Sequence, residues 1–191
     1  LSLHDALPIS QLFPEDELQI FMGIRNPATL LPVLYDVSAD KSPPQFWGDK
    51  DPLDVRWSDT LALLRDSAPE IPVTVWCNED APLIWGQIMR EMAGLPTMAP
   101  LDGEFDLLET IMRPEGMKRF KSYLASHPEM TTAEHPRVIA AFLDKYVIDD
   151  ALEEELDMPS WTEELVEEMT EVYDEDVARI QEIPGVRVIL P

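Results

Sequence analysis

The chain has one cysteine, few glycines, few positive charges and no long apolar run. With Cys77 as its only cysteine, neither an internal disulfide nor a cysteine-based zinc site can form. The chain has eighteen prolines but only seven glycines, which favours helices bounded by prolines over a glycine-rich barrel. No apolar run approaches the roughly 20 residues that a membrane-spanning helix needs. A single cysteine is typical of a reducing compartment, so we expect a cytoplasmic location.

Acidic residues dominate the charge of the 191-residue chain. It has 38 acidic and 14 basic side chains, which gives a formal net charge of −24. This charge opposes long-range encounter with nucleic acid or an anionic membrane, so we expect neither as a partner. A local basic pocket for a small anion remains compatible with it. Hydrophobic residues at 45% and charged residues at 27% exclude a wholly disordered chain, and the length fits one ordinary domain.

The first ten residues resemble a translated sequencing adapter. A common adapter encodes Leu-Ser-Leu-His-Asp-Ala-Leu-Pro-Ile in one reading frame, which matches residues 1–9. The alternative is an ordinary helix whose first turn holds His4 and Asp5. We favour the adapter, exclude His4 as a catalytic candidate, and expect the genuine protein to begin upstream. The chain is then an N-terminally truncated fragment.

Residues 18 to 94 alternate between predicted strands and helices. This order is typical of an α/β layer with parallel strands. Pro32 is expected to end or kink the first helix, and Ser58 is expected to be the N-cap of the second. The predicted elements are strands at 18–24 and 73–77 and helices at 28–37, 58–68 and 82–92.

The pattern after residue 101 is helical. Helices are predicted at 105–112, 115–126, 133–146 and 163–183, followed by a short strand or extended tail at 186–190. Ser160 and Glu163 are spaced as a capping box for the last helix. We therefore expect residues 1–10 to be the adapter, 11–100 an α/β core fragment, and 101–191 a helical C-terminal part of the same domain.

Residues 149–176 contain 14 acids and no lysine or arginine. A calcium or partner site is one interpretation. The run lacks the glycine-centred spacing of an EF-hand loop, so a solvated helical face is favoured.

Residues 20–27 are the most informative segment. A buried strand delivers Arg25 at its carboxyl end, where ligands bind in open α/β sheets, just before a helix that starts near Pro27. Arginine offers a planar fork that suits phosphate, and free N–H groups at the helix start would add to it. The alternative is an arginine that only pairs with Asp16 or Glu79. The residues themselves leave both interpretations open.

Strand-Arg25-Asn26-Pro27 resembles the 3′-phosphate-binding motif of bacterial sulfotransferase-like proteins. Residues 73–80, followed by Pro82 to Gly94, are similar to a later strand and helix of that family, so the resemblance covers about half of the chain. It implies a three-layer P-loop-type α/β domain with a mostly parallel sheet. It also implies a cofactor site in which Arg25 holds the 3′-phosphate of 3′-phosphoadenosine 5′-phosphosulfate, while Asn26 and Pro27 shape the turn.

The implied activity is sulfuryl transfer from this donor to an unknown small-molecule hydroxyl or amine, without a metal. The chain departs from the family at Val33, where a serine usually also binds the 3′-phosphate. The family's phosphosulfate loop is expected upstream of residue 11, so we predict that this fragment is inactive. The alternatives are a non-catalytic α/β binding or interaction protein that has lost the cofactor site, and an unrelated α/β protein in which Arg25 is structural.

The two remaining histidines and the cysteine point to structural roles. His127 and His135 each precede a proline at a predicted helix boundary, and their separation suits no standard metal motif. Caps or surface positions are favoured for both. Cys77 closes an apolar strand and is predicted to be a buried, inert thiol.

A carboxylate pair and a basic cluster complete the candidates. Glu79 and Asp80 follow a strand, where catalytic carboxylates are often found, but capping of the next helix is favoured. Lys118, Arg119 and Lys121 form the only basic cluster. A solvated helix face is favoured for this cluster over a phosphate site.

Overall fold

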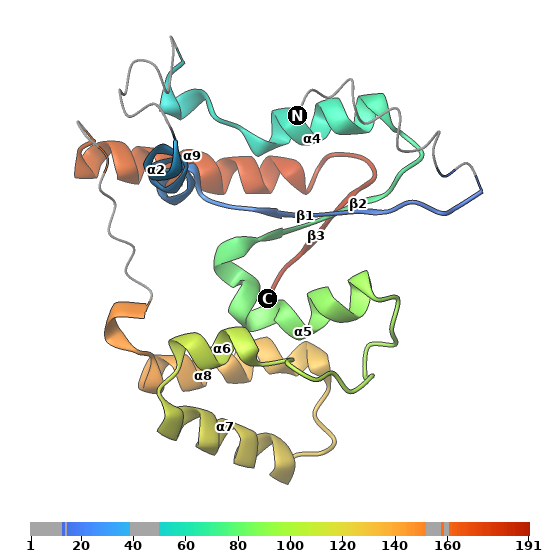
Figure 1. The fold of residues 1–191 in the computed structure, drawn as a ribbon, viewed down its shortest axis with the longest axis vertical. Coiled ribbons are helices and arrows are strands. Elements are labelled where there is room, and N and C mark those ends of the chain that lie inside the picture. Colours follow the sequence, from blue (N-terminus) through green and yellow to red (C-terminus); the bar gives the residue numbers. More distant parts are fainter. Residues whose placement is uncertain (1–12, 14, 39–49, 152–157, 159–160) are drawn as a thin grey trace. The chain divides into compact units, whose positions relative to one another are not determined.

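The computed structural model describes residues 13, 15–38, 50–151, 158 and 161–191, and these form a mixed α/β structure with a parallel three-stranded sheet (Figure 1). The proposed adapter, residues 1–10, lies outside the described residues. Contacts divide the chain into two units. The sheet unit lies within residues 1–77 and 156–188, and the helical unit within 78–155 and 189–191.

The sheet consists of β1 (Ile20–Ile24), β2 (Val73–Cys77) and β3 (Val186–Ile189) in that order. β1 and β2 run parallel, with Ile20 opposite Val73 and Ile24 opposite Cys77. Because successive side chains alternate between faces, every second residue of both strands faces the same side. That face carries the core of the sheet unit, as the apolar composition of both strands predicts.

Two helices supply the other half of this core. They are α4 (Trp57–Ser67) and α9 (Glu163–Ile180), which lie side by side along the sheet (Figure 1). Leu61 of α4 and Tyr173 and Ile180 of α9 are buried against the strands. A short 3₁₀ helix, η2 (Pro52–Asp54), precedes α4.

The helix α2 (Pro27–Val37) begins three residues after Ile24, the last residue of β1. Pro32 does not end it, so that part of the prediction is wrong. A proline here removes one backbone hydrogen bond, but Leu31 and Tyr35 remain buried around it. With Ala28, Leu31 packs against Met169 of α9 in a second apolar cluster.

The helical unit has a core of its own, rich in aromatic residues. Phe120 is fully buried and meets Phe105 and Phe142 edge-on, at ring-centroid distances of 5.0 and 5.5 Å. The unit consists of α5 (Ala81–Met92), α6 (Asp106–Ile111), α7 (Pro114–Ser126) and α8 (His135–Tyr146), with the 3₁₀ helices η3 (Asn78–Asp80), η4 (Thr132–Glu134) and η5 (Asp149–Ala151).

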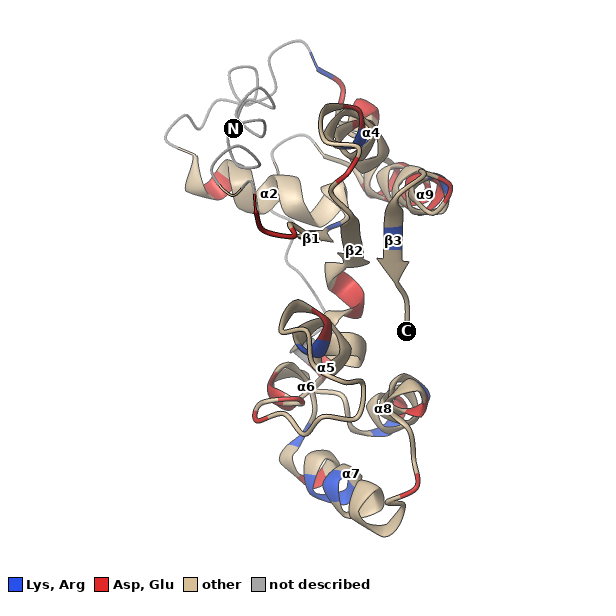
Figure 2. Ribbon diagram, turned by 90° about the vertical axis from the view of Figure 1, so that its right-hand side faces the viewer, with Lys and Arg blue, Asp and Glu red and all other residues tan. Residues whose placement is uncertain are grey.

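Apart from Asp176, the acidic residues of α9 are exposed, as predicted, and Figure 2 shows acidic residues on this helix. Its N-cap is Thr162, whose hydroxyl accepts a hydrogen bond from the Leu165 N–H. The predicted capping residue, Ser160, lies outside the described residues. In the described part of the chain, no helix is both long and apolar enough to cross a membrane.

A buried carboxylate joins α9 to the start of α4. Asp176 is 2% exposed, and its Oδ2 accepts hydrogen bonds from the backbone N–H groups of Trp57 (2.7 Å) and Ser58 (3.1 Å). The Ser58 hydroxyl donates to Oδ1 of the same carboxylate. Ser58 was predicted to be the N-cap of this helix, but it is the second residue of α4, so this prediction is wrong. The capping group comes from a residue more than one hundred positions away, and its charge suits the positive end of the helix dipole.

Replacing Asp176 by alanine removes the acceptor for both N–H groups. Unpaired buried donors are costly, so we expect Asp176→Ala to lower the free energy of unfolding by about 3 kcal/mol. Urea denaturation followed by circular dichroism measures this loss.

Asp174→Ala is the matched control, because Asp174 is exposed on the same helix. It should change the free energy of unfolding by less than about 0.5 kcal/mol. Equal urea midpoints for the two variants would contradict the role given to Asp176.

Candidate functional site

Arg25 lies between the carboxyl end of β1 and the start of α2, and it is half-buried. Its Nε donates a hydrogen bond to the Thr29 hydroxyl at 2.9 Å. Its backbone carbonyl accepts one from the Trp57 indole N–H at 2.8 Å. The structure thus places Arg25 where the sequence predicts it and fixes both its side chain and its backbone.

Asn26 is only 9% exposed, and both ends of its side-chain amide are used. Oδ1 accepts from the Ala28 N–H at 2.9 Å, which makes Asn26 the N-cap of α2. Nδ2 donates to the Thr170 hydroxyl of α9 at 3.0 Å. Asn26 therefore holds the turn, as the resemblance implies, and also ties α2 to α9. Pro27 is the first residue of α2, where its missing N–H costs nothing.

The N–H groups at the start of α2 are already bonded, so the expectation of free donors here is wrong. Pro27 has no N–H, and the Ala28 N–H bonds to the Asn26 side chain. The Thr29 N–H donates to the Asn26 carbonyl at 3.0 Å. A phosphate at this position would rest on the Arg25 guanidinium rather than on the helix end.

Val33 lies further along α2 and is 46% exposed. Its side chain cannot donate a hydrogen bond, so the contact that a serine makes in the resembled family has no counterpart at this position.

Glu79 and Asp80 are the last two residues of η3, which directly follows β2. Asp80 occupies the N-cap position of α5, but its side chain makes no capping hydrogen bond. Burial, followed by the nearby charge of Glu79, raises the pKa of the Asp80 carboxyl. Cys77, which precedes this pair, is buried as predicted.

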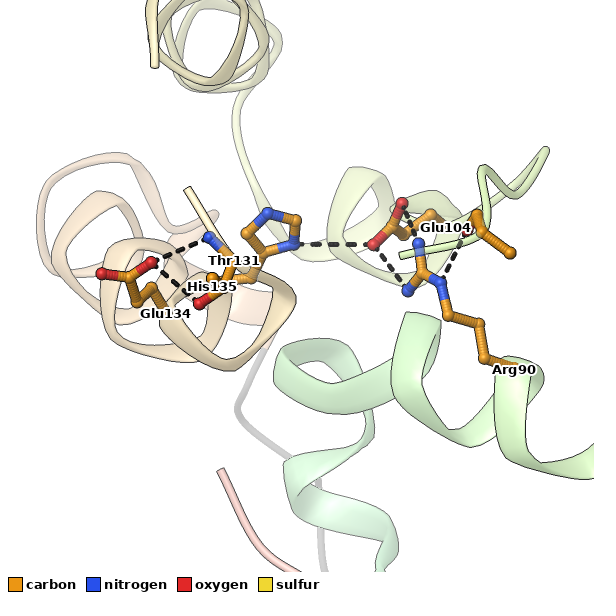
Figure 3. Close-up of polar contacts among 6 residues, drawn as sticks. Arg90, Glu104, Thr131, Glu134 and His135 are labelled. Atoms are coloured by element: carbon orange, nitrogen blue, oxygen red, sulfur yellow. Dashed lines mark hydrogen bonds and ion pairs between the residues drawn. The ribbon is translucent and has the colours of Figure 1, made fainter. Parts of the chain in front are cut away.

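The buried Arg90 and the half-buried Glu104 and His135 form a cluster within the helical unit (Figure 3). Arg90 is 4% exposed and binds both carboxylate oxygens of Glu104, at 3.0 and 2.9 Å. Its Nε donates to the Ala99 carbonyl at 2.8 Å. His135 Nδ1 lies 3.5 Å from Glu104 Oε1. His135 is also the C-cap of η4, which agrees with the capping role favoured from the sequence.

The environment of Glu104 favours its charged form. Burial alone would raise the pKa of this carboxyl, but hydrogen bonds and charge from His135 and Arg90 outweigh burial and hold it below its ordinary value. Gly86 makes room for the pair, because a Cβ there would lie 2.6 Å from Glu104 Cγ. The cluster is fully paired, so we assign it a structural role.

Sequence reasoning missed Arg90 and Glu104 because they lie fourteen residues apart across a connection with no recognisable motif. His127 is the C-cap of α7, as favoured from the sequence, and its ring stacks on Tyr123 at 4.1 Å. Within the described ranges, no group of three or more His, Cys, Asp or Glu side chains is arranged to hold a metal ion.

The chain matches no protein-family model, no curated protein and no solved structure. The resemblance to sulfotransferases therefore rests on the Arg25-Asn26-Pro27 segment and the β2 region alone.

Removing Glu104 should destabilise the helical unit in a pH-dependent way. At pH 7 we expect Glu104→Ala to cost about 3 kcal/mol of unfolding free energy, because it leaves Arg90 buried without its partner. The pKa of Glu104 is lowered in the folded state, so its stabilisation is present above the ordinary value of 4.5 and is lost as the pH falls below it. Urea denaturation between pH 7 and pH 3 measures both effects.

Glu115→Ala is the control, because it breaks an exposed ion pair with Arg119 and should cost less than about 1 kcal/mol. A gap between wild type and Glu104→Ala that stays constant down to pH 3 would contradict this account.

Proposed function

We propose that this chain carries the 3′-phosphate side of a donor site in a sulfotransferase-like protein. The proposal includes a P-loop-type three-layer domain to which β1 and β2 belong. The protein would transfer a sulfuryl group from 3′-phosphoadenosine 5′-phosphosulfate to a hydroxyl or amine acceptor. Residues of this chain would bind the 3′-phosphate end of the donor and would not contact the sulfuryl group that is transferred.

The observation that carries the proposal is the position of Arg25. Arg25 directly follows the carboxyl end of β1, which pairs in parallel with β2. Open α/β sheets bind their ligands at the carboxyl ends of such strands. The hydrogen bond from Nε to Thr29 fixes the plane of the guanidinium group, and a fixed plane is what bidentate phosphate binding requires. The Trp57 indole holds the backbone beneath it.

In the proposed reaction Arg25 is a positioning residue. Its charge would anchor the 3′-phosphate and so set the direction in which the phosphosulfate points. Sulfuryl transfer would proceed as an in-line displacement, in which the bond to the acceptor oxygen or nitrogen forms as the bond to the phosphate oxygen breaks. Cationic groups at the bridging oxygen would stabilise the transition state, and Arg25, which holds the 3′-phosphate, is not one of them.

A second candidate is a non-catalytic binding or interaction protein with the same fold. The bonded N–H groups at the start of α2 and the apolar Val33 favour it, because they remove two sources of phosphate contacts. Binding of 3′-phosphoadenosine 5′-phosphate, the molecule that remains when the donor has lost its sulfuryl group, separates the two candidates.

The test is calorimetric titration of the 191-residue chain with 3′-phosphoadenosine 5′-phosphate. We expect a micromolar Kd that Arg25→Ala weakens by about 10-fold to 100-fold, the range of a charge-assisted hydrogen bond. Adenosine 5′-phosphate lacks the 3′-phosphate, so it should bind more weakly and should not respond to Arg25→Ala.

Arg179→Ala is the control variant, because it removes one exposed positive charge from the same unit. It should leave the Kd within about 2-fold, and circular dichroism should show all variants folded. Absence of binding, or equal losses in both variants, would sink the proposal and favour the non-catalytic candidate.

A further inference from the structure

The helical unit contains a groove between α7 and α8. It has a volume of about 840 Å³ and is open to solvent. Two serines and a set of basic and aromatic side chains line it, chiefly Lys118, Arg119, Tyr123, Phe142, Lys145 and Tyr146.

The aromatic rings give the groove a fixed apolar floor. Phe142 packs edge-on against the buried Phe120 and lies 5.9 Å from the Tyr123 ring. Tyr146 stacks near Phe142 at 6.1 Å. Its Cβ lies so close to the α7 backbone that a Cβ at Gly116 would approach it to 2.3 Å. The floor is therefore held by the core of the unit and by the close approach of the two helices.

The rim of the groove is basic in an otherwise acidic chain. Lys118, Arg119 and Lys145 are exposed, and the last two lie over the Tyr146 ring, at 5.9 and 5.6 Å from its centroid. Among the described residues that line the groove, Glu115 alone is acidic, and it pairs with Arg119 at 2.9 Å. These lining residues include one acid and three bases, whereas the whole chain has 38 acids and 14 bases. Figure 2 shows this concentration of basic residues on α7.

The sequence pattern favours a solvated helix face for the basic cluster on α7. Lys121 fits that description, because it is exposed and pairs with Glu109 outside the groove. Lys118 and Arg119 instead stand beside an apolar floor. Positive charge next to half-buried aromatic rings is suited to an anionic ligand that also has apolar groups.

We propose that this groove binds an acidic amphipathic helix of a partner protein. The thirteen residues of α7 extend for about 20 Å, so about 14 residues of a partner helix match the groove in length. Apolar side chains of such a helix, three and four residues apart, would cover Phe142 and Tyr146, and flanking carboxylates would meet Lys118 and Lys145.

The charge of the chain argues for this occupant over two others. A nucleic acid presents a long row of phosphates to a molecule of net charge −24, which is unfavourable beyond the groove itself. A second copy of the chain has the same net charge, so two copies repel each other. A short acidic helix presents its charge only at the rim.

The test uses the full chain and a fluorescein-labelled peptide of about 14 residues, with leucine at positions i, i+3, i+4 and i+7 and glutamate at most of the others. Fluorescence anisotropy should give a micromolar Kd. Lys118→Glu/Lys145→Glu should weaken binding by at least about 10-fold, because both contacts become repulsive. A peptide with glutamine in place of glutamate should lose a similar factor.

Lys121→Glu/Arg137→Glu is the matched control. It makes the same change in net charge at two exposed positions of α7 and α8 that do not line the groove. It should change the Kd by less than about 2-fold at physiological salt, where separated charges are screened.

Four results would overturn the proposal. The first is absence of peptide binding, and the second is equal weakening in the groove and control variants, which indicates attraction by charge alone. The third is tighter binding of a uridine oligonucleotide of about 14 bases than of the peptide, which would assign the groove to single-stranded RNA. The fourth is a dimer in sedimentation experiments that Lys118→Glu/Lys145→Glu abolishes, which would assign it to a second copy.

Discussion

The hydrogen bonds of the buried Asp176 carboxylate are the interaction on which the arrangement of the sheet unit depends. They attach α9 to the first residues of α4, while Asn26 attaches the same helix to α2 through Thr170. α9 thus has polar contacts with two helices that come much earlier in the chain. A buried carboxylate tolerates little displacement, because its hydrogen bonds must replace those lost to water. Leu61 and Tyr173 then pack against the strands, and this packing adds to the polar contacts that already define the position of α9.

Local signals in the sequence predicted most of the secondary structure. The apolar, β-branched run at 73–77 has the bounds of β2, because such residues favour strands wherever they are buried. Helix starts were less predictable where the capping group comes from elsewhere. Ser58 has the residue type of an N-cap, yet the carboxylate that caps α4 lies on α9. The Arg90–Glu104 pair was missed for the same reason, since nothing in the order of residues indicates that the two side chains meet.

The candidate site shows why a binding motif and a helix-capping motif are hard to separate in a sequence. Asn26-Pro27 is an excellent helix start, since asparagine accepts from the second helical N–H and proline needs no acceptor. The structure gives both residues this role. Arg25 differs, because the geometry of the turn does not require a guanidinium. Its identity is therefore the part of the motif that helix capping leaves unexplained, and the proposed function rests on it.

The glycine at position 86 has a consequence for how relatives of this chain can vary. Any side chain there would collide with Glu104 and with the Arg90 guanidinium. Substitutions at positions 86, 90 and 104 are therefore coupled, because a change at one position requires a compensating change at another. A homologue with alanine at 86 should have a shorter residue at 104 and an uncharged residue at 90. The three positions should therefore covary, although none of them belongs to a motif that can be recognised in a single sequence.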